Sequence, residues 1–217
     1  MYSFTEENYL KAIYKLSQDD SATTNAIAVE LKTKAASVTD MLKKLADKKL
    51  ITYVKYQGVS LTDKGRKVAV ITVRKHRLWE VFLHEKLEFK WDEVHDIAEQ
   101  LEHIQSDVLM DKLDAFLNFP TVDPHGDPIP RKDGTIKDAK LKVLSDISEG
   151  KSVIMSGVKE HSPVFLQYLE KTGLLLGKKI KVNEILKFDG SVQLQIGKGS
   201  QVQISKEVAK NILVADA

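Results

Sequence analysis

Histidine and glutamate side chains recur at helical spacing in the segment HDIAEQLEH, residues 95–103. An α-helix turns by about 100° per residue, so His95, Glu99, Glu102 and His103 fall on one narrow face of the cylinder. Imidazole nitrogens and carboxylate oxygens gathered on one face can converge on a divalent cation. The spacing therefore predicts a metal site. The alternative is that these are solvated side chains on an acidic helix.

A second pair, His76 and Glu80 in the segment RKHRLWE, is spaced i, i+4 and so shares a face of a preceding helix. If the two helices pack side by side, this pair can meet His95 at one ion, and the rest of the first face remains for another. We therefore expect two metal sites per subunit. The chain contains no cysteine, which favours Mn²⁺, Fe²⁺, Zn²⁺, Co²⁺ or Ni²⁺ over Cu⁺. We expect His84 to be ordinary surface and leave the role of His125 open.

Three helical patterns precede these segments. Apolar residues at helical spacing predict a first helix over residues 5–16, with Thr5 as its N-cap. A second, short helix follows, capped by Thr24 or Asn25, and a third covers residues 35–48. Two short helices joined by a tight turn are the pattern of a helix-turn-helix, which binds DNA.

Two β-prone runs, residues 50–54 and 59–61, surround a turn that contains Gly58 and predict a hairpin. A hairpin directly after a helix-turn-helix is the wing of a winged helix. The alternative is an all-helical bundle that carries one hairpin.

Basic residues concentrate between Lys32 and Lys67, where ten Lys or Arg oppose three Asp, a net charge of +7. Such side chains neutralise phosphates and give salt-dependent affinity, whereas small and polar residues at the start of the third helix can approach base edges. The alternative is a solvated lysine face. The predicted DNA-contacting residues are Ala35, Ala36, Ser37, Thr39, Asp40, Lys43, Lys44 and Lys55.

Two long amphipathic helices are predicted next, over residues 63–87 and 91–117, and we expect them to supply a dimer interface. The second carries eight acids against one lysine, a net charge of −7, as suits a cation-binding part. Four of the five prolines then fall in residues 118–134, which predicts irregular chain and a linker.

The remainder of the chain is β-like. Alternating apolar and polar residues predict strands, and a short helix that ends at Gly173, arranged as a small barrel. The predicted strands are residues 153–158, 179–185, 192–196 and 201–204, and the predicted helix is residues 163–171. The predicted fold class is mainly α with small β parts. The predicted domains are residues 1–65 (winged helix-turn-helix), 66–120 (helical, metal-binding and dimerising), 121–149 (linker) and 150–217 (small β-barrel).

Several function classes find no support in the sequence. The first residues, MYSFTEENYLK, carry acids where a signal peptide is basic, and no stretch approaches the roughly 18 apolar residues of a membrane span, so we expect a cytoplasmic protein without a membrane partner. There is no Gly-rich phosphate loop, nucleophile elbow or HExxH motif, so we expect no enzyme activity. The rivals are a metal-dependent hydrolase, a metal-storage protein, and a winged-helix regulator that senses another signal through its barrel.

Several segments together resemble the diphtheria toxin repressor family of metal-dependent regulators, in its long, three-part form. They are TEENYLKAIYKL, SVTDMLKKLADKKLI, LTDKGRKVA, VRKHRLWEVFL, VHDIAEQLEHIQSD and HGDPIP. The tail, including FLQYLEKTGLLLGKKIKV, is similar to the FeoA-type small barrel that ends many members. The resemblance implies a homodimeric repressor that binds a palindromic operator in double-stranded DNA when activated by Mn²⁺ or Fe²⁺.

The resemblance also implies ligands. The ancillary metal site corresponds to His76, Glu80 and His95. The primary, regulatory site corresponds to Glu99, Glu102 and His103. Members add a first-helix ligand at the position of Asn8, where iron regulators tend to have Met and manganese regulators Asp; here either the Asn8 amide oxygen or the neighbouring Glu7 is the candidate. Iron regulators tend to have Cys where this chain has Glu99, so the resemblance favours Mn²⁺ first and Fe²⁺ second. Further implied ligands are Asp123, and Glu160 or His161 from the barrel.

Overall fold

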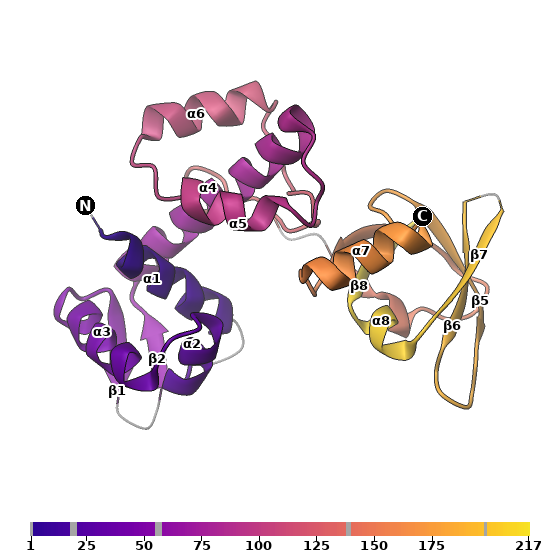
Figure 1. Ribbon diagram of the computed structural model, residues 1–217, viewed down its shortest axis with the longest axis horizontal. Helices are drawn as coiled ribbons and strands as arrows, with labels where there is room; N and C mark the ends of the chain where they lie inside the picture. Colours follow the sequence, from indigo (N-terminus) through magenta and orange to yellow (C-terminus); the bar gives the residue numbers. More distant parts are fainter. Residues whose placement is uncertain (1, 18–20, 55–57, 138–139, 198) are drawn as a thin grey trace.

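The computed structural model describes residues 2–17, 21–54, 58–137, 140–197 and 199–217. Helices dominate the first 117 residues and strands dominate the remainder, and Figure 1 shows the two parts side by side along the long axis. The helices are α1 (Phe4–Leu16), α2 (Thr24–Glu30), α3 (Ala35–Asp47), α4 (Asp63–Leu87), α5 (Val94–Leu101), α6 (Asp107–Phe116), the 3₁₀ turn η1 (Leu144–Asp146), α7 (Pro163–Thr172) and α8 (Lys206–Lys210). The strands are β1 (Ile51–Val54), β2 (Gly58–Leu61), β3 (Lys142–Val143), β4 (Ser152–Val158), β5 (Lys179–Ile185), β6 (Val192–Ile196), β7 (Ser200–Ile204) and β8 (Ile212–Asp216).

The first two helices begin earlier than the sequence pattern predicts. Ser3, not Thr5, caps α1: its side chain accepts a hydrogen bond from the Glu6 N–H, and the Glu6 carboxylate accepts one from the Ser3 N–H. This reciprocal capping box satisfies two N–H groups that a start at Thr5 would leave open. Thr23, rather than Thr24 or Asn25, caps α2 by accepting from the Ala26 N–H.

A single apolar core joins α1, α2, α3 and the β1–β2 hairpin. Leu10 of α1, Ile27 of α2 and Leu42 of α3 are fully buried in it. The hairpin leads directly into α4, whose first turn lies against the start of β1. A Cβ on Gly65 would lie 1.9 Å from the Leu50 carbonyl oxygen, so only glycine permits this approach. The long helix α4 is thereby fixed to the hairpin at its first turn.

The predicted helix over residues 91–117 is wrong, because the structure divides it into α5 and α6. Helix α5 ends at Leu101, and residues 102–106 turn before Ser106 caps α6 by accepting from the Leu109 N–H. The alternative backbone bonding that a serine offers favours a new helix start at this point. Glu102 and His103 therefore lie at and beyond the end of α5 rather than on its continuous face.

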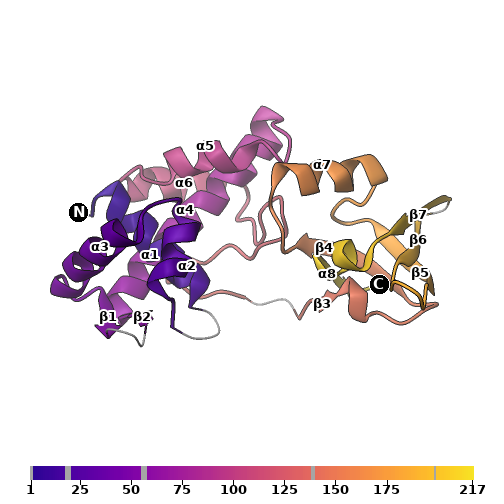
Figure 2. The ribbon, with the colours of Figure 1, turned by 60° about the horizontal axis from the view of Figure 1, so that its bottom comes forward.

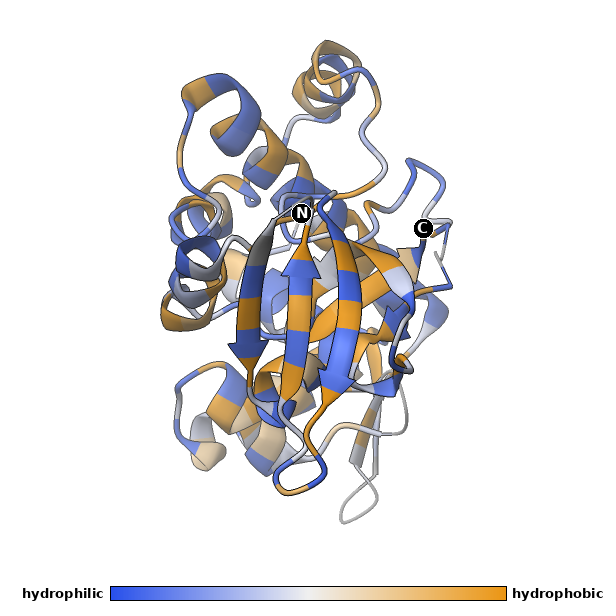
Figure 3. Ribbon diagram, turned by 90° about the vertical axis from the view of Figure 1, so that its right-hand side faces the viewer, coloured by the Kyte–Doolittle hydropathy of each residue, from blue (hydrophilic) through white to orange (hydrophobic). Residues whose placement is uncertain are grey.

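The C-terminal part is one antiparallel sheet in the order β3-β8-β4-β5-β6-β7. Alternate side chains of β4, β5 and β6 are buried. Figure 3 shows the matching pattern, with apolar and polar residues alternating along the strands. The predicted strands at residues 179–185 and 192–196 are confirmed, as is the helix that ends at Gly173. Elements β3, α8 and β8 were absent from the sequence prediction; β8 pairs with β4 in the middle of the sheet.

The stretch predicted as a linker contributes to the packed structure. Residues after α6 run from the helical part toward the sheet, as Figure 2 shows. Ile129 is buried in the apolar cluster that residues of α4, α5 and α6 form, and Asp123 and His125 are buried among polar groups. Arg77 of α4 fixes the stretch by donating to the Pro128 carbonyl oxygen and to Asp127.

Candidate metal centre

Helices α1, α4 and α5, the stretch around Asp123, and the segment that leads into α7 surround one cavity of about 660 Å³. Histidine and acidic side chains from four of these segments line it, together with the basic side chains of Lys11 and Lys15 from α1. The centre is therefore assembled from segments far apart in the sequence.

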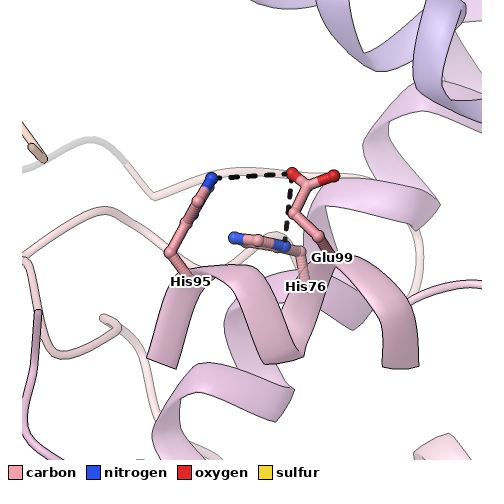
Figure 4. Close-up of side chains that lie close together, drawn as sticks. All are labelled: His76, His95 and Glu99. Atoms are coloured by element: carbon pink, nitrogen blue, oxygen red, sulfur yellow. Dashed lines mark ion pairs between the residues drawn. The ribbon is translucent and has the colours of Figure 1, made fainter. Parts of the chain in front are cut away.

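The first cluster of donor atoms combines His76 of α4 with His95 and Glu99 of α5. Their ligand atoms all lie within 4.8 Å of one another. Glu99 Oε1 is 3.9 Å from His76 Nδ1 and 3.7 Å from His95 Nε2, so one carboxylate oxygen faces two imidazoles, as Figure 4 shows. We call these three residues the first cluster.

Glu102 and His103 extend the first cluster toward α1. Glu102 is fully buried, and its Oε2 lies 2.6 Å from His76 Nδ1. The Nδ1 of His103 lies 2.7 Å from Glu7 Oε2, and Gln105 donates to the other Glu7 oxygen at 2.7 Å. Glu7 is thus held by two partners, neither of which the sequence patterns indicated.

The second cluster consists of Glu80, Asp123 and His125, all buried, with ligand atoms within 4.8 Å of one another. The Nδ1 of His125 is 3.7 Å from Glu80 Oε2 and 4.0 Å from Asp123 Oδ1. His161, half-buried in the segment before α7, lies with its ring 4.9 Å from the His125 ring. The candidate Glu160 is exposed and instead accepts a hydrogen bond from the Ser162 N–H.

The structure brings the predicted trio of His76, Glu80 and His95 together and adds further donors. Glu80 Oε1 lies 3.0 Å from His76 Nε2 and 3.4 Å from His95 Nδ1, while His76 Nδ1 faces Glu102. His125, whose role the sequence left open, belongs to the second cluster. Its only sequence signal was that it begins the HGDPIP motif.

Burial and neighbouring charges in the two clusters shift the pKa values of their own side chains. Burial disfavours a charged His76, but Glu80 and Glu102 outweigh it and raise the pKa of His76 to about 9. Burial likewise opposes ionisation of Glu80, but the charge of His76 and hydrogen bonds from His125, His76 and His95 bring its pKa well below the usual value. The carboxylate of Glu80 is therefore ionised at neutral pH.

In the second cluster, burial and then the charges of Glu80 and Asp127 raise the pKa of Asp123 to about 7. His125 is disfavoured as a cation by burial, yet hydrogen bonding and charge from Glu80, with the charge of Asp123, raise its pKa to about 9. Burial, with the charge of His125, lowers the pKa of His161. His76 and His125 therefore carry protons at neutral pH that a bound cation would have to displace.

Three buried polar atoms fit a metal better than they fit the protein alone. Glu102 Oε1, Asn8 Oδ1 and His161 Nε2 have no hydrogen-bond partner among the described residues. A buried polar atom without a partner is costly, and a bound cation would satisfy each of them. Nitrogen and oxygen donors of this kind suit Mn²⁺, Fe²⁺ and Zn²⁺. The residues present therefore fit a divalent metal.

The predicted DNA-contacting side chains lie on one side of α3. Val38, Leu42 and Leu45 point into the core, and Thr39 is half-buried with its hydroxyl donating to the Ala35 carbonyl. The exposed members of the predicted set are Ala35, Ala36, Ser37, Asp40, Lys43 and Lys44. Lys55 lies outside the described residues.

Comparisons with known proteins cover nearly the whole chain. Residues 1–59 match the family model "Iron dependent repressor, N-terminal DNA binding domain", residues 62–131 match "Iron dependent repressor, metal binding and dimerisation domain", and residues 142–216 match the "FeoA domain". The chain is 32% identical over 167 residues to the iron-dependent repressor IdeR of Mycobacterium leprae, covering 72% of this chain and 73% of that one.

Solved structures agree. A manganese-dependent transcriptional repressor in complex with manganese has a TM-score of 0.87 at 34% identity, over 98% of this chain and 100% of that one. The manganese regulator SloR has a TM-score of 0.77 at 36% identity, over 98% of each chain. These matches confirm the predicted resemblance and fold class. Among the described residues, no helix combines the length and apolar character of a membrane span.

Proposed function

The chain belongs to the iron-dependent repressor family, that of the diphtheria toxin repressor, in its long form with a FeoA domain, and on that premise we propose its specific action. Members are metal-dependent transcriptional repressors. We propose that this one is a cytoplasmic homodimer without enzyme activity, activated by Mn²⁺ and less selectively by Fe²⁺, which controls metal-ion homeostasis from palindromic operators. The observation that carries the proposal is the oxygen- and imidazole-rich first cluster beside α1.

Two metal sites per subunit are proposed from the donor atoms. The regulatory site takes the first cluster with Glu102, and Asn8 and His103 at the α1 side. The supporting site takes the second cluster with His161. Asn8 is favoured over Glu7 as the α1 ligand because its Oδ1 has no partner among the described residues, whereas Glu7 is already bonded to His103 and Gln105.

Helix α1 connects the regulatory site to the DNA-binding surface. Its Asn8 faces the cavity, and its Glu6 forms an ion pair with Lys48, the C-cap of α3. A bound divalent cation would bind Glu99 and Glu102 together with Asn8 of α1 and would so favour one fixed position of α1. The two α3 helices of a dimer would then match successive major grooves, about 34 Å apart. Metal and operator consequently raise each other's affinity by the same factor.

The proposed dimer uses the outer face of α6. Several large apolar side chains there and just beyond it are exposed, which is unusual for a surface that stays in water. They are Val108, Leu109, Phe116, Phe119 and Val122. The matched family model describes this part of its members as a dimerisation domain. We also propose the division into domains 1–65, 66–120, 121–149 and 150–217 given by the sequence.

Operator binding with and without metal tests the proposal. DNA fragments selected from the source genome are titrated with the protein in chelator and then in Mn²⁺ or Fe²⁺. We expect a sequence-selective complex only with metal, and His103→Ala should remove this dependence. Equal affinity in chelator and in metal would reject the proposal. A metal hydrolase or a storage protein would give no metal-dependent complex.

A further inference from the structure

A lysine of the chain itself already pairs with Glu99 of the first cluster and with the adjoining Glu102. Lys11 of α1 reaches the end of α5, where its ammonium bonds Glu99 Oε1 and lies 2.7 Å from Glu102 Oε2. Its side chain is 18% exposed, and that of Glu102 is fully buried. This is a partly buried charge pair between two helices rather than a surface contact, so its electrostatic energy is less screened.

The ammonium uses the oxygens that a metal would need. Glu99 Oε1, which Lys11 bonds, is the same atom that faces His76 Nδ1 and His95 Nε2 at 3.9 and 3.7 Å. Glu102 Oε2, its second acceptor, is the atom that lies 2.6 Å from His76 Nδ1. The other oxygen of Glu102, Oε1, is buried without a hydrogen-bond partner among the described residues. Figure 4 shows how the Glu99 oxygen turns toward both rings.

We infer that Lys11 is a built-in competitor for the regulatory site, a specificity-determining residue whose ammonium must leave Glu99 and Glu102 before a divalent cation binds. The inference rests on the proposed function, because it assumes that the first cluster is the regulatory site. A lysine can make this exchange because its four-carbon stem is flexible and its charge remains well solvated when the head group turns outward. The open cavity beside α1 gives the head group somewhere to go.

Two consequences follow for the metal-free protein. The ion pairs of Lys11 join α1 to α5 in an arrangement that differs from the metal-bound one, because a metal would take over the same carboxylate oxygens. They also raise the free metal concentration needed for activation, since each binding event must break them. Weakly binding or scarce cations are then rejected, and the activation threshold depends on Lys11.

Metal titration of DNA-free protein tests the inference. Purified full-length wild type, Lys11→Gln and Lys11→Arg are titrated with Mn²⁺ in competition with a fluorescent chelator. We expect Lys11→Gln to bind Mn²⁺ tighter by about tenfold or more, the order expected when one charge a few ångströms away is removed from a partly buried site. Lys11→Arg, which keeps the charge, should remain close to the wild type.

Lys15→Gln is the matched control. Lys15 lies one turn further along α1 and pairs with Glu30, with its side chain 67% exposed. It removes the same charge from the same helix, so its Mn²⁺ affinity should change little. Unchanged or weaker Mn²⁺ binding by Lys11→Gln would overturn the inference, as would an equal gain in Lys15→Gln. A wild type that binds no Mn²⁺ would instead contradict the proposed function.

Thermal unfolding gives a second readout that does not depend on activity. Without Lys11, the buried Glu102 loses a cationic partner, so the metal-free Lys11→Gln variant should melt at a lower temperature than the wild type. Its gain in melting temperature on adding Mn²⁺ should be larger, because binding no longer breaks ion pairs. Equal gains for the two proteins would contradict the competition.

Discussion

The two donor clusters each take one residue from α4, His76 and Glu80, which lie one turn apart. The clusters differ in how exposed their side chains are and in which segments supply the other donors. In the second cluster, Glu80, Asp123 and His125 have side chains at most 3% exposed. In the first, His95 is 51% and Glu99 is 32% exposed. Folding alone fixes the positions of the buried donors in the second cluster. The positions of the exposed donors in the first cluster also depend on the cation that binds them.

The partners of the two clusters differ in the same way. The second cluster is balanced by its own imidazoles and by Arg77, whose Nε lies 3.5 Å from Asp123. The first is balanced by Lys11, which comes from the DNA-binding part of the chain. The first cluster is therefore joined to α1 by direct ion pairs. This difference is why we assign regulation to the first cluster and support to the second.

The largest expected difference between the two sites comes from removing one carboxylate charge from each in turn and measuring metal-dependent operator binding. Glu102→Gln removes a buried donor from the regulatory site and should weaken metal-dependent operator binding by about a hundredfold. This is the upper end of the roughly 10–100-fold loss that follows when a residue supporting a metal ligand is mutated. Glu80→Gln should cost about tenfold, because it acts on the supporting site. DNA-binding titrations at fixed free Mn²⁺ measure both. The reverse order of effects would refute the assignment.

A pH series should separate the clusters next. Metals bind deprotonated ligands, and His76 and His125 have pKa values raised to about 9, so affinity at both clusters should fall as pH falls, by about tenfold per unit for each proton displaced. Asp123, with its pKa raised to about 7, takes up a further proton below that pH. The second cluster should therefore lose affinity more steeply in acid.

The measurement isolates one site at a time. Glu102→Gln leaves the donors of the second cluster in place, and Asp123→Asn leaves those of the first, so each variant is titrated with Mn²⁺ between about pH 6 and about pH 8, where histidines change charge. Equal slopes for the two variants would mean that the burial of Asp123 has no consequence for binding.

The smallest effect should come from the start of α1. Ser3→Ala removes the capping hydrogen bond to Glu6 and should destabilise the helix by about 1 kcal/mol. Because α1 supplies Asn8 to the regulatory site and no donor to the second cluster, Mn²⁺ affinity should fall a few-fold at the regulatory site and stay unchanged at the second cluster. Calorimetric titration that resolves the two sites checks this. Thr5→Ala, at the position the pattern predicted as the cap, serves as the control and should have little effect.

Local patterns predicted much of the molecule because they depend only on neighbouring residues. The apolar spacing along residues 63–87 gave the bounds of α4, and the alternation along residues 179–185 gave those of β5. The same patterns did not predict the helix caps or the break before α6. Those features depend on the side chains of Ser3, Thr23 and Ser106 accepting from backbone N–H groups, which apolar spacing does not reveal.

What the sequence by itself determined was the supply of donors: imidazoles and carboxylates at helical spacing, a basic segment on a winged helix, and no thiol. Tertiary structure alone decided which donors meet. Packing brought His76 into contact with Glu102 and brought His125 from a proline-rich stretch to Glu80. It also paired Lys11 with Glu99. Helical spacing fixes only the angle about one axis, whereas a coordination site depends on the distances between several chain segments, and packing sets those.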